Sequence, residues 1–205
     1  LEAVLPIVKR YGCAVIGLAH DEDGLPPTAE GRFAVAERIV EAAERCGIPR
    51  TDVVIDCLTM ACATNQSEAL EILRAVSMVK ERLGVRTALG VSNISFGLPQ
   101  RNMVNSTFLA AAFGCGLDMP ILNPKAKRYT DTVNTFRVLN CQDAGAVGFI
   151  GEYADAADPY TAGAAGAGTA VGAAEAAQPS GAADAAAECP VTVPETLSDA
   201  SDAVR

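Results

Sequence analysis

A pattern of three parts, repeated four times, constrains the fold more than any other feature of the sequence. In each copy an apolar run of strand length is followed by polar residues and then by apolar residues at helical spacing. The apolar runs lie at about residues 13–19, 53–55 and 87–91, and the fourth, a short strand interrupted by Gly116 and Pro120, is expected within 115–122. The helical segments lie at about 28–46, 67–83, 102–114 and 129–139. Alternating elements of this kind build parallel sheets with right-handed crossovers. The pattern predicts an α/β fold, and by itself it permits either half of a (β/α)8 barrel or a small doubly wound sheet.

The first copy carries further local signals. A helix is expected over residues 2–11 and is broken by Gly12. The run at 13–19 shows no alternation of apolar and polar side chains, so we expect this strand to be buried on both faces. Thr28 is the expected N-cap of the helix that follows.

Polar side chains follow three successive strands. Asp21 and Glu22 come after the first, Asp56 ends the second, and Ser92 with Asn93 ends the third. If the strands are parallel neighbours, these ends converge at one mouth, where ligands bind in such folds. Simpler interpretations stay open. The acidic pair is more simply explained as solvated surface, Asp56 can cap a turn, and Ser92 with Asn93 can merely shape one.

Composition narrows the class of protein. The 205 residues carry a net charge of -9, and no basic stripe marks a nucleic-acid surface. No apolar run is long enough to span a membrane, no glycine-rich phosphate loop is found, and we expect a cytoplasmic protein. The chain begins at Leu1 without an initiator Met, so we expect it to be part of a longer one.

The cysteines do not indicate a metal site. Seven are spread along the chain without a C-x-x-C pair, and there is a single histidine. We therefore expect no metal site, and we expect buried, free thiols in a reducing compartment.

The composition changes near residue 153. Residues 153–195 are rich in Ala, Gly and Pro and carry few large apolar side chains, which predicts a flexible linker. Residues 196–205 read as the start of another helix or domain. The expected folded domain is therefore residues 1–152.

Three ordered blocks resemble one family. Residues 54–58 (VIDCL), 90–95 (GVSNIS) and 105–118, from NSTFL to CGLD, resemble the pterin-binding methyltransferases. This family includes the methyltetrahydrofolate-binding domains of cobalamin-dependent methionine synthases and methyltetrahydrofolate–corrinoid protein methyltransferases. The continuation at 96–99 (FGLP) is closer to the methionine synthase type.

The resemblance implies a dihydropteroate synthase-like (β/α)8 barrel of which this chain supplies only the C-terminal half, about four βα units. The N-terminal half would be a missing partner, and a homo-oligomer is possible. The resemblance further implies that Asp56 hydrogen-bonds the pterin, that Asn93 reaches the N5 region and is catalytic, and that Ser92 and Arg101 bind substrate.

The chemistry implied is transfer of the N5 methyl group of methyltetrahydrofolate to a cobalamin or corrinoid carrier on a partner domain or protein, as in methionine biosynthesis and one-carbon metabolism. The chain alone would be an incomplete enzyme. A non-catalytic half-barrel that binds or assembles with other parts is the alternative. Dihydropteroate synthase is less favoured, because that family places basic residues after the corresponding Ser, whereas Asn93 and Ile94 follow Ser92 here.

Overall fold

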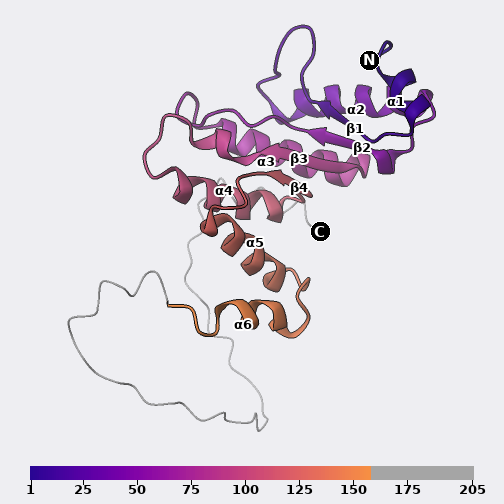
Figure 1. Ribbon diagram of the computed structural model, residues 1–205. Coiled ribbons are helices and arrows are strands. Elements are labelled where there is room, and N and C mark those ends of the chain that lie inside the picture. Colours follow the sequence, from indigo (N-terminus) through magenta and orange to yellow (C-terminus); the bar gives the residue numbers. More distant parts are fainter. Residues whose placement is uncertain (158–205) are drawn as a thin grey trace, which may run out of the picture. The chain divides into compact units, whose positions relative to one another are not determined.

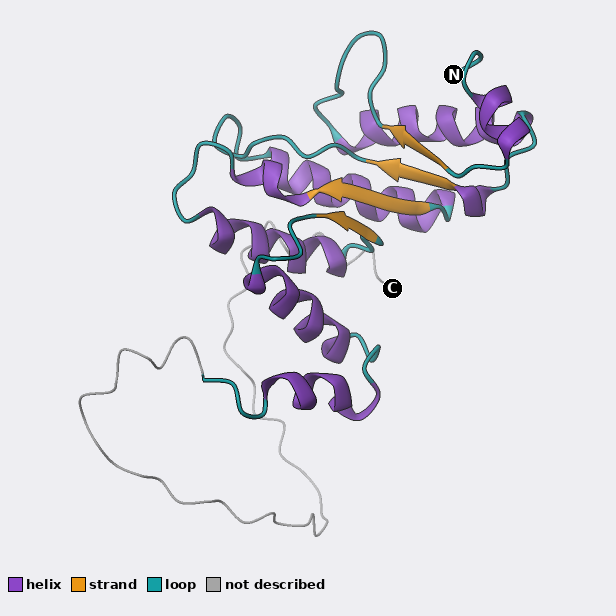
Figure 2. Ribbon diagram, in the orientation of Figure 1, coloured by secondary structure: helices purple, strands orange, loops and turns teal. Residues whose placement is uncertain are grey.

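Four parallel strands form the centre of the fold in a computed structural model that describes residues 1–157. The strands are β1 (Val15–Leu18), β2 (Val53–Asp56), β3 (Arg86–Gly90) and β4 (Met119–Ile121). They lie in the order β1-β2-β3-β4, and the four arrows in Figure 2 point the same way. Residues 158–195 of the expected linker lie outside the described part of the chain, and so does the helix start expected at 196–205.

Helices alternate with these strands, as the repeat predicts (Figure 1). The helices are α1 (Leu5–Tyr11), α2 (Ala29–Arg45), α3 (Glu68–Met78), α4 (Arg101–Gly114), α5 (Lys127–Leu139) and α6 (Val147–Tyr153). The short turns are η1 (Arg50–Asp52), the π-helical η2 (Val79–Leu83), η3 (Val91–Ser95) and η4 (Ala144–Ala146). Helix α6 was not predicted, because its seven residues include two glycines and show no long apolar periodicity. Residues Leu1–Ala156 form one compact unit.

Local signals set several of these boundaries. The Thr28 hydroxyl accepts a hydrogen bond from the Gly31 N–H at 3.2 Å, which confirms the expected N-cap of α2. Helix α3 continues into η2, and Gly84 then ends it with a φ of 65°, a left-handed conformation that suits glycine. A side chain at Gly17 would bring its Cβ within 2.6 Å of Ile39, so glycine permits the close approach of β1 and α2.

The strand order decides between the two folds that the sequence permitted. Each strand pairs with the next in the chain, and α2 contacts α3, α3 contacts α4, and α4 contacts α5. A doubly wound sheet would instead reverse its strand order and place helices on both faces. The observed order, with one layer of helices, is consistent with part of a (β/α) barrel.

The hydrophobic core lies between the sheet and this helix layer. From the sheet it takes Val53, Ile55 and Leu89. From the helices it takes Phe33, Ala36, Ile39, Val40, Ala43, Ile72, Ala75, Val76, Phe108, Leu109 and Ala112. These residues recur at helical spacing, so the apolar faces predicted from the sequence point toward the sheet.

The opposite face of the sheet is exposed along its two edge strands, whereas the central strand β2 is buried on both faces. Ile16 and Leu18 on β1 are 53% and 44% exposed, and Met119 and Ile121 on β4 are 42% and 58% exposed. The expectation that the first strand is buried on both faces is therefore wrong in this structure. An apolar run indicates that a strand is suited to burial. The face of the sheet that points away from the helices is buried only if a second layer of structure covers it.

The cysteines of the described residues agree with the sequence prediction in being free but not in their burial. Within residues 1–157, six cysteines are free, as expected, and Cys57 is the only one of these six that is fully buried. Cys13 and Cys141 are exposed, so the expectation of burial is wrong for these two. Both exposed thiols follow helix ends, where an apolar neighbourhood in sequence does not mean burial. Within residues 1–157, no helix is long and apolar enough to cross a membrane.

Candidate functional site

A cleft of about 680 Å³ lies at the carboxyl ends of the strands. Asp56 is the last residue of β2, Gly90 the last of β3 and Ile121 the last of β4. The residues that line the cleft are His20, Leu25, Asp56, Leu58, Thr59, Met60, Gly90, Ser92, Asn93 and Ile121. This is the edge of the sheet where parallel α/β folds bind their ligands, and the volume is typical of a small-molecule site.

Asp56 enters the cleft from the centre of the sheet. Its backbone pairs with Leu18 on one side and Ala88 on the other, so its position is fixed by two neighbouring strands. One carboxylate oxygen, Oδ1, accepts a hydrogen bond from the Leu58 N–H at 2.8 Å. Burial raises the pKa of Asp56 above its ordinary value, and the Leu58 N–H lowers it by a smaller amount. A buried carboxylate with spare acceptor capacity suits a ligand that brings N–H donors.

Ser92 and Asn93 lie in a 3₁₀ turn, since β3 already ends at Gly90 and η3 begins at Val91. A Cβ at Gly90 would lie 3.1 Å from the Asn93 side-chain nitrogen, so the absence of a side chain there leaves room for the amide. Ser95 Oγ donates to the Ser92 carbonyl at 3.2 Å and braces the turn. The Asn93 amide itself makes no hydrogen bond to any residue between 1 and 157, so both its donor and its acceptor are available in the cleft.

Arg101, by contrast, is not among the residues that line the cleft. Its guanidinium donates to Ser95 Oγ and to the Ser92 carbonyl, both at 2.9 Å, and its Cζ lies 4.4 Å from the centroid of the Phe96 ring. These contacts place the side chain behind the turn that carries Asn93. The structure therefore brings Asp56, Ser92 and Asn93 together and gives Arg101 the position of a support for that turn.

The end of β1 differs from the simplest expectation. Asp21 and Glu22 do not line the cleft. The Asp21 carboxylate pairs with Arg38 of α2 at 2.5 Å and accepts from the Asp23 N–H at 3.2 Å, which matches the surface interpretation of this acidic segment. His20 lines the cleft in their place. The sequence could have identified His20 as a cleft residue from its closeness to the strand end, because the residues nearest the end of a parallel strand face the mouth of the cleft.

Thr59 is a second cleft residue that the sequence did not single out. Its hydroxyl is buried and has no hydrogen-bond partner in the described part of the chain. Buried hydroxyls are usually paired, so an orphan beside Asp56 is unusual. Nothing in the sequence around Thr59 distinguishes it from an ordinary turn residue.

The cleft therefore combines an acceptor-rich wall with apolar surfaces. Asp56 supplies negative charge or a proton, Asn93 supplies a neutral donor and acceptor, and Leu25, Leu58 and Ile121 supply flat apolar contact. This set suits a flat heterocycle with polar edges. Among residues 1–157, no group of three or more His, Cys, Asp or Glu side chains gathers as a metal site would require.

Comparisons with known proteins agree with this description. Residues 2–123 match the family model of the pterin binding enzymes. The chain is 38% identical over 127 residues to a methionine synthase of Mycobacterium leprae (strain TN), a match over 58% of this chain and 10% of that protein. It is 36% identical over 127 residues to a methionine synthase of Mycobacterium tuberculosis (strain ATCC 25618 / H37Rv), over 58% of this chain and 11% of that protein.

A further relative is a methylcorrinoid:tetrahydrofolate methyltransferase of Eubacterium limosum, 26% identical over 114 residues, which are 55% of this chain and 42% of that protein. The chain thus spans about a tenth of the length of the two methionine synthases and about two fifths of this relative. All four predicted site residues lie within the matched range. Since that range is more than half of the sequence and contains the cleft, the chain belongs to the pterin-binding enzyme family.

Proposed function

We propose that this chain forms the pterin-binding wall of a methyltransferase that passes the N5 methyl group of methyltetrahydrofolate to a corrinoid carrier. One observation carries the proposal: the carboxylate of Asp56 and the amide of Asn93, which has no hydrogen-bond partner within residues 1–157, line one cleft where the adjacent parallel strands β2 and β3 end. The names of the relatives support the reaction class, since they include a methylcorrinoid:tetrahydrofolate methyltransferase and methionine synthases.

Asp56 binds and orients the pterin in this proposal. One of its oxygens is held by the Leu58 N–H, which leaves the other for N–H groups of the ring. This contact exists before and during the reaction, so it contributes mainly to substrate affinity. Loss of one such buried bond costs about 1–3 kcal/mol.

Asn93 acts at N5. An amine nitrogen leaves poorly unless it is protonated or hydrogen-bonded while its charge changes. A neutral amide can donate or accept, and Asn93 has no competing partner within residues 1–157. A preorganised group of this kind stabilises the transition state more than the bound substrate. The corrinoid, when bound on its partner domain or protein, supplies the group that accepts the methyl.

Arg101 supports Asn93 in this proposal, because its guanidinium holds the Ser92 carbonyl at 2.9 Å. Ser92 lines the same wall and contributes to substrate binding. The predicted substrate contact of Arg101 would then be indirect, through the turn that it braces.

The test is single-turnover methyl transfer to cob(I)alamin, with affinity for methyltetrahydrofolate measured separately by calorimetry. The protein used should contain all the strands of its barrel. We expect Asp56→Asn to weaken folate binding and Asn93→Ala to slow transfer. A protein that binds no reduced folate under these conditions would contradict the proposal.

A second candidate is a non-catalytic half-barrel that binds pterin or assembles with another part. The exposed edge strands favour it, because Ile16, Leu18, Met119 and Ile121 are left exposed at the two edges of the described sheet. Pterin binding without methyl transfer by the chain alone would support this candidate. Transfer that appears once a complementary N-terminal half is added would support the methyltransferase.

A further inference from the structure

Arg32 on α2 is the most deeply buried charged residue of the described chain, with a side chain that is 0% exposed. Burial of a guanidinium is costly unless the charge is paired and its donors are satisfied. Even when paired, a buried ion pair is often no more stabilising than apolar side chains of similar volume. The contacts of Arg32 are therefore a better guide to its role than its charge is.

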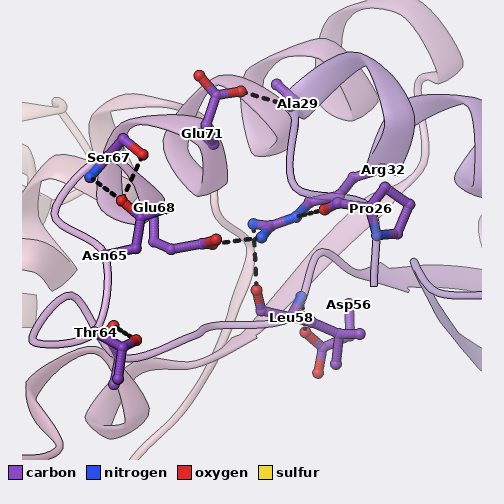
Figure 3. A network of polar contacts seen from close by, with 11 residues as sticks. Pro26, Ala29, Arg32, Asp56, Leu58, Thr64, Asn65, Ser67, Glu68 and Glu71 are labelled. Carbon is purple, nitrogen blue, oxygen red and sulfur yellow. Dashed lines mark hydrogen bonds and ion pairs between the residues drawn. The ribbon is translucent and has the colours of Figure 1, made fainter. Parts of the chain in front are cut away.

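Three segments meet at this guanidinium (Figure 3). Arg32 Nε donates to the Pro26 carbonyl at 3.1 Å, Nη1 to the Leu58 carbonyl at 3.5 Å, and Nη2 to Glu68 Oε2 at 2.6 Å. Pro26 belongs to the loop after β1, Leu58 to the loop after β2, and Glu68 to the first turn of α3. Two of these segments also line the cleft, the loop after β1 through Leu25 and the loop after β2 through Leu58 itself.

Leu58 is the most constrained of the three. Its φ of 60° is a left-handed conformation that residues with a side chain avoid. In this conformation its N–H donates to Asp56 Oδ1 at 2.8 Å while its carbonyl faces Arg32 (Figure 3). One strained residue is thus held between the candidate pterin carboxylate and the buried guanidinium.

The helices around this turn are also tied together. Glu71 on α3 accepts a hydrogen bond from the Ala29 N–H, at the start of α2, at 2.7 Å. With the Arg32–Glu68 pair, this contact fixes the first turns of α2 and α3 against each other. The guanidinium therefore sits on a rigid base and can hold the turn after β2 in place.

We propose that Arg32 is a positioning residue of the pterin site, which holds the turn from Asp56 to Leu58 in the geometry that directs the Asp56 carboxylate into the cleft. The inference rests on the proposed role of Asp56 in pterin binding. Arg32 does not touch the substrate. It acts through the strained Leu58, whose left-handed conformation would relax without a partner for its carbonyl.

The test compares Arg32→Lys with Arg45→Lys in the full-length protein. Lysine keeps the charge but cannot reproduce the planar fork that reaches three acceptors. Arg45 lies on the same helix, has a side chain that is 71% exposed and pairs, within residues 1–157, only with Glu41, at 3.6 Å, so it is the matched control. Three quantities are measured: amide exchange of Leu58, affinity for methyltetrahydrofolate, and the split between KM and kcat.

For Arg32→Lys we expect Leu58 to exchange about tenfold faster and KM to rise about tenfold with little change in kcat, the scale of one lost hydrogen bond. Arg45→Lys should change none of these. A global loss of stability would speed exchange at all core amides, whereas the inference requires a change confined to the loops around Arg32. Wild-type exchange of Leu58 together with wild-type KM would overturn it.

Two further results separate this inference from the proposed function. If the wild-type protein binds no folate, the proposed function fails and the inferred effect of Arg32 on folate affinity fails with it, whereas faster Leu58 exchange in Arg32→Lys would still show that Arg32 holds the turn from Asp56 to Leu58. If Asp56→Asn weakens binding but Arg32→Lys does not, only the inference fails. Should Arg32→Lys not fold, the double variant Arg32→Met/Glu68→Leu removes both charges together. Retained Leu58 protection in that variant would overturn the inference, and its loss would support it.

Discussion

Replacement of Asn93 by alanine tests the catalytic proposal most directly. The Asn93 amide makes no hydrogen bond within residues 1–157, and its side chain is half-buried at the cleft. Alanine therefore leaves no buried partner unsatisfied, and the free energy of unfolding should change by no more than about 0.5 kcal/mol. Loss of one preorganised donor in an active site lowers a rate about 10²–10³-fold, or about 2.7–4 kcal/mol of transition-state stabilisation. A rate effect of this size with unchanged stability cannot arise from unfolding.

The assay is single-turnover methyl transfer from methyltetrahydrofolate to cob(I)alamin, with folate affinity from calorimetry and stability from urea unfolding. The matched control is Asn140→Ala, an exposed asparagine that follows α5 and does not line the cleft. We expect Asn93→Ala to lose rate with a much smaller change in affinity, and Asn140→Ala to behave as wild type. Transfer by Asn93→Ala at the wild-type rate would refute the reasoning and leave Asn93 as a residue that only shapes its turn.

Three further predictions follow from the burial of Asp56 and Cys57 and from the exposure of apolar residues on the sheet. Because burial raises the pKa of Asp56, the folded protein holds this proton more tightly than the unfolded chain, and the associated stability is lost as pH rises through the folded pKa. Asp56→Asn should therefore raise the urea midpoint of unfolding at pH 7. It should not raise this midpoint at about pH 3, where the Asp56 carboxyl group is protonated in both the folded and the unfolded protein. An equal shift at both pH values would contradict this prediction. Burial, followed by the nearby Asp56 charge, raises the pKa of the Cys57 thiol to about 12, so iodoacetamide at about pH 8 should label the exposed Cys141 and spare Cys57 in the native protein, as read by mass spectrometry. The exposed apolar face should make this chain associate, so light scattering should detect oligomers that Leu18→Lys with Ile121→Lys disperses; a wild-type monomer would count against this interpretation.

The sequence by itself determined the number and order of the four strands and of helices α1 to α5, but not helix α6. Strand ends, helix faces and boundaries are local properties, written in apolar periodicity, in the Thr28 cap and in Gly84. It also placed Asp56 at the end of a strand, which the structure confirms, and Asn93 at the end of the next, where the structure instead has a 3₁₀ turn that follows β3. The predicted linker after residue 153 and the roles of the four site residues stay predictions.

Only the tertiary structure decided which faces and side chains those elements present. The exposure of Ile16 and Leu18 depends on whether a second layer covers the sheet, and no local pattern records that. The choice of His20 over Asp21 at the cleft depends on how the chain turns after β1 and on the distant Arg38 that draws Asp21 away. The role inferred for Arg32 depends on contacts 26 and 36 residues away in sequence, with Leu58 and Glu68. Such contacts form only when helices and loops pack, and their free energy is therefore a property of the fold rather than of any segment.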